Sequence, residues 1–203
     1  MNCRGHNQRI LIVQNWNINP VVHMKLLNNQ HVISDAGGSK ITDSYVLFKC
    51  SRKDNSSIID TICCSPTTAR DLCQLSHQTM PSFFNPLHQN GEGHGIGGNH
   101  PHQSWNQCRK QLYNIVLLLI AYFGSDKTNT PLYDIKIKLE EYTSFPPFFS
   151  YIKSVNTIIG NTKHGKFTNI INYLTENNNN LRNFPYELVL NELNNNNIEQ
   201  HFE

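Results

Sequence analysis

The sequence carries little charge of either sign. Only 16% of its 203 residues are Asp, Glu, Lys or Arg, and the formal net charge is +2. A domain that binds nucleic acid mainly by neutralising phosphates is usually much more basic than this. Composition alone therefore does not indicate a nucleic-acid partner. The hydrophobic fraction of 38% is too high for a disordered chain and allows one medium domain with an extension, or two small domains.

Long apolar runs are also missing. The longest, at residues 112–123, contains Asn114 and is shorter than the roughly 18 residues that a membrane span needs. We therefore expect a core helix or a buried strand there, and no membrane partner. Residues 1–9 are polar and show no apolar signal core, so we expect an intracellular or organellar location.

The six cysteines include no Cys-x-x-Cys pair. Without a secretion signal, cysteines in a chain of this size are expected to be reduced thiols and not a disulfide framework. Asparagine is over-represented, with 28 copies that include the runs 177–180 and 194–197. Because Asn, Ile, Lys and Tyr have A/T-rich codons, this bias is typical of an A/T-rich genome. The runs are predicted to be turns or linkers.

The chain divides by composition into three zones. Short β-favouring runs separated by turn signals lie at residues 10–13, 21–27, 45–49 and 58–63. Their length and spacing predict a small antiparallel barrel or sandwich. In the last zone apolar residues recur with helical periodicity, which predicts helices at residues 112–123, 135–142, 151–159 and 186–193.

The middle zone is rich in histidine and glycine. Residues 77–108 hold five of the ten histidines and five of the eleven glycines. Glycine loses more backbone entropy on ordering than any other residue and has no side chain to pack. This segment is therefore predicted to be a loop that something outside it must order.

A zinc site is one interpretation of this zone. Cys63, Cys64, Cys73 and His77 are residue types that bind zinc, and the last two stand one helical turn apart. The paired Cys-x-x-Cys spacing of structural zinc sites is missing, however, and buried structural cysteines are the simpler interpretation.

Two enzyme classes are further alternatives. In a nucleotidyl transferase or hydrolase of the histidine-triad type, His100 and His102 would share one face of a strand, where one attacks a phosphate and the other orients it. Pro101 counts against that strand because it removes a ladder donor. A His-finger nuclease is suggested by His77 and His88, but the cysteines expected between these pieces are absent.

A fourth interpretation explains more positions together. From Asn85 the chain has Asn-Pro-Leu, then Gly-Glu-Gly at 91–93, Gly-Gly at 97–98, His-Pro at 100–101 and Trp105. This order resembles the signature loop of the universal large-subunit ribosomal protein L-two, in its bacterial and organellar form. The family loop has Asn-Pro-Val followed by the same four pieces, whose spacing here agrees without a gap.

Upstream pieces extend the resemblance to about half of the chain, residues 15–108. In order, they resemble the family's Val-His-Asn segment, its Ala-Gly turn, its Tyr-Val-x-Leu-Arg strand and its strand ending in Cys-x-Ala-Thr. The matching pieces are Val22-His23, Ala36-Gly37, residues 45–49 and residues 58–67.

The resemblance implies an SH3-like β-barrel at residues 15–84 and an rRNA-binding extended loop at residues 85–108, after an N-terminal tail at residues 1–14. The family's OB-type half has no room before the barrel, so we expect that this half is a separate chain or has been lost. Residues 109–203 form a helical, Asn-rich extension outside the resemblance. We expect the acidic residues and the 112–123 stripe of this extension to face other proteins.

The function implied is that of a structural constituent of the large subunit of a mitochondrial ribosome, encoded in the organelle. The protein would bind large-subunit rRNA near the peptidyl transferase centre and support subunit association, beside neighbouring mitoribosomal proteins. The family has a longer stretch after Asn-Pro, so its histidine near that centre is assigned to His88. No catalytic residue, metal ligand or cofactor is implied, apart from Mg²⁺ ions of the rRNA. The alternative is the transferase that uses His100 and His102.

The residue chemistry of the loop also suits RNA. Glycine lets the backbone approach phosphates and 2′-hydroxyls at distances where a Cβ would collide. Imidazoles, amides and flanking cations can contact phosphate, while the tryptophan offers a stacking face or anchors the loop to the barrel. The candidate RNA-binding residues are Arg70, His77, His88, Asn90, Gly91, Gly93, Gly95, Gly97, Gly98, His100, Pro101, His102, Trp105, Arg109 and Lys110.

Overall fold

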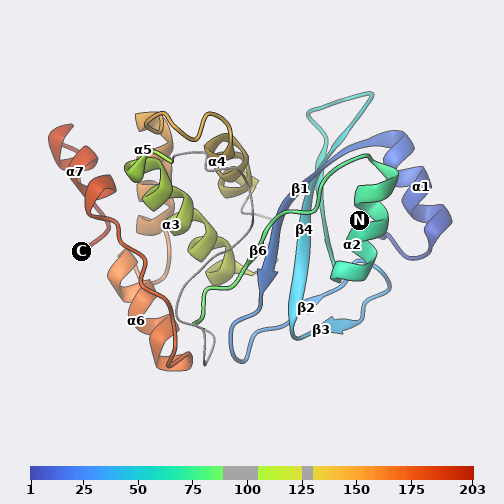
Figure 1. The fold of residues 1–203 in the computed structure, drawn as a ribbon, viewed down its shortest axis with the longest axis horizontal. Helices are drawn as coiled ribbons and strands as arrows, with labels where there is room; N and C mark the ends of the chain where they lie inside the picture. The colour runs from blue at the N-terminus through green and yellow to red at the C-terminus, as the bar shows by residue number, and fades with distance from the viewer. Residues whose placement is uncertain (89–104, 125–129) are drawn as a thin grey trace. The chain divides into compact units, whose positions relative to one another are not determined.

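The computed structural model describes residues 1–88, 105–124 and 130–203, and these ranges contain seven helices and six strands (Figure 1). The chain divides into two compact units: unit 1 comprises residues 1–85 with 123–133, and unit 2 comprises residues 86–122 with 134–203. The strands are β1 (Trp16–Lys25), β2 (Val32–Ile33), β3 (Lys40–Ile41), β4 (Ser44–Arg52), β5 (Ile59–Cys64) and β6 (Phe83–Phe84). The helices are α1 (His6–Asn15), α2 (Pro66–Leu75), α3 (Gln107–Phe123), α4 (Thr130–Glu140), α5 (Phe149–Gly160), α6 (Phe167–Asn177) and α7 (Glu187–Asn195).

Unit 1 is built on an open four-stranded sheet. Its strand order is β5-β4-β1-β6, with antiparallel pairing except between β1 and β6, and β2 and β3 form a separate two-stranded sheet. The strands predicted at 21–27, 45–49 and 58–63 fall largely in β1, β4 and β5. Among the described residues the sheet does not close into a barrel, and two helices pack on it, so unit 1 has mixed α and β structure.

A register shift in β1 changes which of its residues lie on each face of this sheet. Ile18 pairs with Cys50, whereas Val22 pairs with Leu47, because the register shifts between Pro20 and Val22. Proline has no N–H to donate to a ladder, and such residues are tolerated at bulges. Since side chains alternate along a strand, the shift moves the even-numbered residues of β1 to the opposite face.

The first helix replaces a predicted strand. Residues 10–13 lie within α1, so the prediction of a β-run there, within an N-terminal tail, was wrong. A four-residue apolar run fits a helix or a strand equally well by periodicity, and tertiary contacts decide here. Ile12 packs in the core between helices and sheet, while Asp71 of α2 bonds the side chains of His6 and Arg9.

Helix α2 was not predicted, although its N-terminus has a recognisable signal. The Ser65 hydroxyl accepts a hydrogen bond from the Thr68 N–H, and Pro66 occupies the first turn. Its buried face, Ala69, Leu72 and Cys73, joins residues of β1, β4 and β5 in one core. Helices α1 and α2 lie side by side against the sheet (Figure 1).

Unit 2 consists of helices. The predicted helices at 112–123, 135–142, 151–159 and 186–193 fall largely in α3, α4, α5 and α7. Helix α6 was missed, although its buried residues Phe167, Ile170 and Leu174 have helical spacing. No described helix is both long and apolar enough to cross a bilayer.

The apolar stripe of α3 is internal. Residues 115–121 are all buried, with exposed fractions of 4% or less. A helix that is apolar on all sides belongs in the middle of its domain. The expectation that this stripe faces other proteins was therefore wrong. Exposed aromatic side chains lie instead in the connection between α4 and α5, where Tyr142, Phe145 and Phe148 are 61–73% exposed.

Candidate nucleic-acid interface

The residues just before the Gly/His-rich segment are held by backbone pairing. Leu87 and Leu181 form an antiparallel bridge. The His88 N–H donates to the Asn180 carbonyl oxygen at 2.7 Å, and Asn180 Nδ2 donates to the His88 carbonyl oxygen at 2.7 Å. The imidazole of His88 is exposed. This pairing fixes the backbone of His88 and leaves its ring at the surface.

The residues just after the segment are held at the start of α3. The Asn106 N–H donates to the Thr143 carbonyl oxygen at 2.9 Å, and its side-chain Oδ1 accepts from the Arg109 N–H at 3.1 Å. The second bond satisfies a free N–H at the helix N-terminus, as capping residues do. Both flanks of residues 89–104 are thus anchored within unit 2.

Trp105 and Lys110 form the core of a cluster at this anchor. The half-buried indole lies 4.9 Å from the Tyr113 ring, and Lys110 Nζ lies 4.6 Å from the indole centroid and 5.2 Å from the Tyr113 centroid. A cation over an aromatic face is stabilised by about 0.5–1 kcal/mol at a partly exposed site. The described contact of Trp105 is with Tyr113 of α3, in unit 2. Anchoring of the loop to the barrel and stacking on a base both stay predictions.

Arg182 links the two flanks electrostatically. Its backbone N–H donates to the Pro86 carbonyl oxygen at 2.9 Å, which places Arg182 beside the first flank. Burial lowers the pKa of Lys110, the nearby Arg182 charge lowers it further, and Glu140 opposes the shift. We call Trp105, Lys110, Tyr113 and Arg182 the aromatic–cation cluster.

The carboxylate next to this cluster is already engaged. Glu140 Oε1 accepts from the Tyr113 hydroxyl at 3.0 Å and pairs with Lys136 Nζ at 2.7 Å. The Lys136 side chain is only 3% exposed, and burial lowers its pKa. Glu140 is thus bonded to both Tyr113 and Lys136, and Lys110 and Arg182 are the cations of the cluster.

Arg109 has a different surrounding from the one predicted. It is 3% exposed, and its guanidinium donates to the carbonyl oxygens of five residues in the stretch 138–146. The expected phosphate contact requires an accessible guanidinium, so we do not retain Arg109 in the proposed interface. Its role here is to satisfy carbonyl groups at the end of α4 and in the following turn.

Arg70 and His77 belong to unit 1. Arg70 is exposed on α2, close enough to His23 for its charge to lower the pKa of that imidazole, which burial lowers more strongly. His77 ends α2 in a left-handed conformation, with φ of 55°. The Gln78 N–H donates to the Cys73 carbonyl at 2.9 Å, as in a Schellman cap. His77 therefore has a structural position, and its exposed ring can still meet a ligand.

Nine of the candidate residues lie outside the described residues. They are Asn90, Gly91, Gly93, Gly95, Gly97, Gly98, His100, Pro101 and His102.

The cysteines considered for zinc are core residues. Cys63, Cys64 and Cys73 are buried, whereas His77 is exposed at the helix end. In the part of the chain that the structure describes, no three His, Cys, Asp or Glu side chains are grouped closely enough to hold a metal ion.

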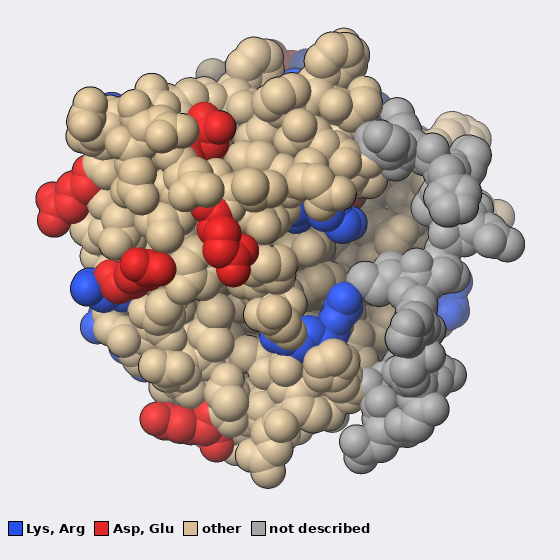
Figure 2. All heavy atoms as spheres, turned by 60° about the vertical axis from the view of Figure 1, so that its left-hand side comes forward, with Lys and Arg blue, Asp and Glu red and all other residues tan. Residues whose placement is uncertain are grey.

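Charged side chains are sparse on the face that Figure 2 shows. Figure 2 shows a face on which Asp and Glu side chains lie mostly to one side, while the described Lys and Arg side chains occupy separate positions. An RNA contact on such a surface depends on a few positioned cations and on backbone and aromatic groups, not on a broad basic patch.

Sequence reasoning missed two members of the cluster. Tyr113 follows Lys110 by three residues, and this spacing places two side chains on one helix face. Arg182 carries no comparable signal, because it follows an Asn run and reaches the cluster through long-range pairing with residue 86. No protein-family model, curated protein or solved structure matches this chain.

Proposed function

We propose that this protein is a structural, rRNA-binding constituent of the large subunit of a mitochondrial ribosome. In this proposal unit 1 is a variant of an SH3-like domain, and the Gly/His-rich segment contacts large-subunit rRNA near the peptidyl transferase centre. The protein contributes no catalytic group, and its partners are the rRNA, neighbouring mitoribosomal proteins and a separate chain that carries the OB-type half.

One observation supports this proposal most directly. Both flanks of residues 89–104 are anchored in unit 2, and the aromatic–cation cluster lies at the anchor. Lys110 and Arg182 supply positive charge for phosphates, while Trp105 and His88 supply rings for bases. A Gly-rich segment between such flanks can bring its backbone N–H groups close to RNA.

The test is RNA binding by the full chain with matched variants. Lys110→Gln removes the cation over Trp105 and Tyr113. Lys163→Gln is the control, because Lys163 Nζ also lies over an aromatic ring, 4.7 Å from the Tyr173 centroid. We expect Lys110→Gln to weaken binding to a fragment of large-subunit rRNA by about fivefold and to reduce the salt slope by roughly 0.7–1. The control variant is expected to bind as tightly as the unmodified chain.

Equal affinities for the two variants would contradict the proposed interface. The transferase alternative makes a different prediction, in which the purified chain turns over a nucleotide without RNA and His100→Ala abolishes that turnover. That result would replace the ribosomal proposal.

A further inference from the structure

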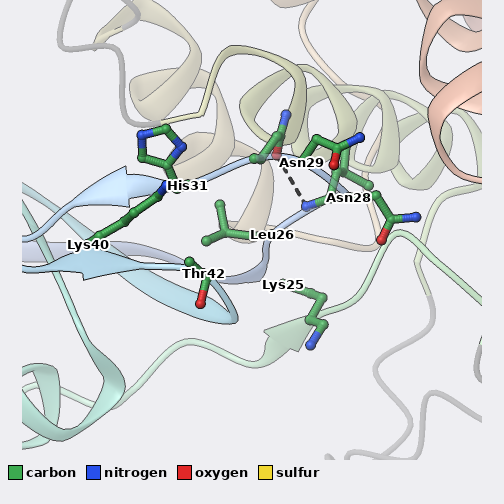
Figure 3. A pocket seen from close by; sticks show the side chains of 9 residues that line it. Lys25, Leu26, Asn28, Asn29, His31, Lys40 and Thr42 are labelled. Atoms are coloured by element: carbon green, nitrogen blue, oxygen red, sulfur yellow. Dashed lines mark hydrogen bonds between the residues drawn. The ribbon is translucent and has the colours of Figure 1, made fainter.

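A hollow on unit 1 carries a set of side chains that the sequence analysis did not single out. Its volume is about 490 Å³, and it lies where the end of β1, the following turn and the start of β3 come together (Figure 3). The lining residues are Lys25, Leu26, Leu27, Asn28, Asn29, Gln30, His31, Lys40 and Thr42.

The lining favours an anion. It contains two ammonium groups, an imidazole, three carboxamides and a hydroxyl, and it includes no Asp or Glu. The side chains of Lys40 and His31 are exposed, and among the described residues neither side chain has a hydrogen-bond or ion-pair partner. The Lys25 ammonium pairs with Asp43, whose side chain is 76% exposed. An anion that binds the Lys25 ammonium has to displace this exposed carboxylate.

The wall of the hollow is ordered by its own hydrogen bonds. The Gln30 N–H donates to the Leu27 carbonyl at 3.0 Å, and the Leu27 N–H donates to Gln30 Oε1 at 3.2 Å. Asn29 has φ of 63°, the left-handed conformation that asparagine tolerates in turns. Leu26 and Leu27 are buried beneath the turn. The polar groups are therefore presented by a fixed backbone, which reduces the entropy lost on binding.

We propose that this hollow binds a phosphate group. Ammonium, imidazole and amide N–H groups can donate hydrogen bonds to phosphate oxygens, and no Asp or Glu is among the lining residues. The expected source is a phosphodiester of bound RNA, and this part rests on the proposed function. The phosphate site itself does not depend on the proposed function, because a free phosphate compound would bind to the same groups.

The test measures two ligands with the full chain and two charge-matched double variants. Lys25→Gln with Lys40→Gln alters the hollow, whereas Lys153→Gln with Lys166→Gln removes two exposed lysines of unit 2. Binding of a labelled rRNA fragment and of inorganic pyrophosphate is measured for each protein. We expect the first variant to bind RNA about tenfold more weakly, to lower the salt slope by about 1.4 and to lose pyrophosphate binding. The control should retain both.

The outcomes separate the two proposals. Loss of pyrophosphate binding with unchanged RNA affinity would support the phosphate site and overturn RNA as its source. Loss of pyrophosphate binding in a chain that binds no RNA at all would overturn the proposed function alone. Unchanged binding of both ligands would overturn the phosphate site. If the variant fails to fold, amide shifts in the unmodified chain decide, because pyrophosphate must perturb residues 28–31.

Discussion

The Arg109 side chain donates from Nε to the Phe145 carbonyl oxygen at 2.7 Å. The same guanidinium donates from Nη2 to Pro146 at 3.1 Å and from Nη1 to Glu141 at 2.8 Å. One buried cation thus satisfies carbonyl groups that the end of α4 and the next turn leave without helical partners. It also fixes the stretch of chain that exposes Phe145.

Replacing this arginine is expected to cost stability without a direct effect on RNA contacts. Arg109→Met should lower the free energy of unfolding of unit 2 by about 3 kcal/mol, because several buried carbonyls lose a charged donor. Arg52→Met is the control. Arg52 is 42% exposed and pairs with Asp54, so its loss should cost less than about 1 kcal/mol. Chemical denaturation measures both, and a stable Arg109→Met chain with weak RNA binding would contradict this role.

Replacing His77 by glycine is expected to raise stability. Its φ of 55° is strained for a residue with a Cβ and is natural for glycine at a helix C-terminus. His77→Gly should therefore raise the thermal midpoint, with a gain of about 0.5–1 kcal/mol, provided that the ring makes no essential contact. A matched His6→Gly variant should lower stability, because that residue lies in α1 and its imidazole bonds Asp71. A drop in stability for His77→Gly would show that the ring has a structural contact.

The imidazole of His23 should make unit 1 less stable in mild acid. Burial, aided by the charge of Arg70, lowers its pKa from the usual 6.5. The unfolded chain then takes up the proton at a higher pH than the folded chain does. This contribution is complete above pH 6.5 and is lost as the pH falls toward the folded pKa. The free energy of unfolding, measured by chemical denaturation between pH 5 and 7.5, should depend less steeply on pH in His23→Gln than in the unmodified chain. An equal dependence on pH in the two proteins would contradict the assignment.

Cys50, Cys63, Cys64 and Cys73 should behave as inert core residues. Burial raises the pKa of Cys50 to about 12 and that of the half-buried Cys108 to about 11. We expect alkylation at pH 8 to modify Cys108 slowly and the buried thiols only on unfolding, as peptide mass spectrometry can show. Treatment with a chelator should leave the melting temperature unchanged. One tightly bound zinc ion per chain would instead support the zinc interpretation.

Local patterns predicted most of the long elements, and they gave the wrong structure at residues 10–13, where distant contacts decide. The apolar residues at 112–123 predicted α3, and those at 45–49 predicted β4, because in each element the apolar residues of the sequence are the ones that become buried. Residues 10–13 are ambiguous locally, and docking against α2 through Asp71 makes them helical. The capping signal at Ser65 and Pro66 was present in the sequence and was overlooked.

The candidate site shows the same division. Trp105 was found because it ends a recognisable motif and Lys110 because it follows that motif, and the two side chains are in contact. Arg109, their neighbour in sequence, is directed inward by carbonyls about 30 residues further along. Arg182 and the hollow at residues 25–42 depend on long-range pairing or on a turn conformation that composition does not reveal.

The central claim is tested most directly by ultraviolet crosslinking in purified mitochondrial large subunits, followed by mass spectrometry of peptide–nucleotide adducts. The proposed function predicts that the protein sediments with these subunits and that peptides from residues 85–110 carry nucleotides of the large-subunit rRNA. Replacing Gly97 or Gly98 by Val should prevent its incorporation while leaving unit 1 folded. A protein that sediments apart from ribosomes, or that incorporates without any crosslink in this region, would contradict the account.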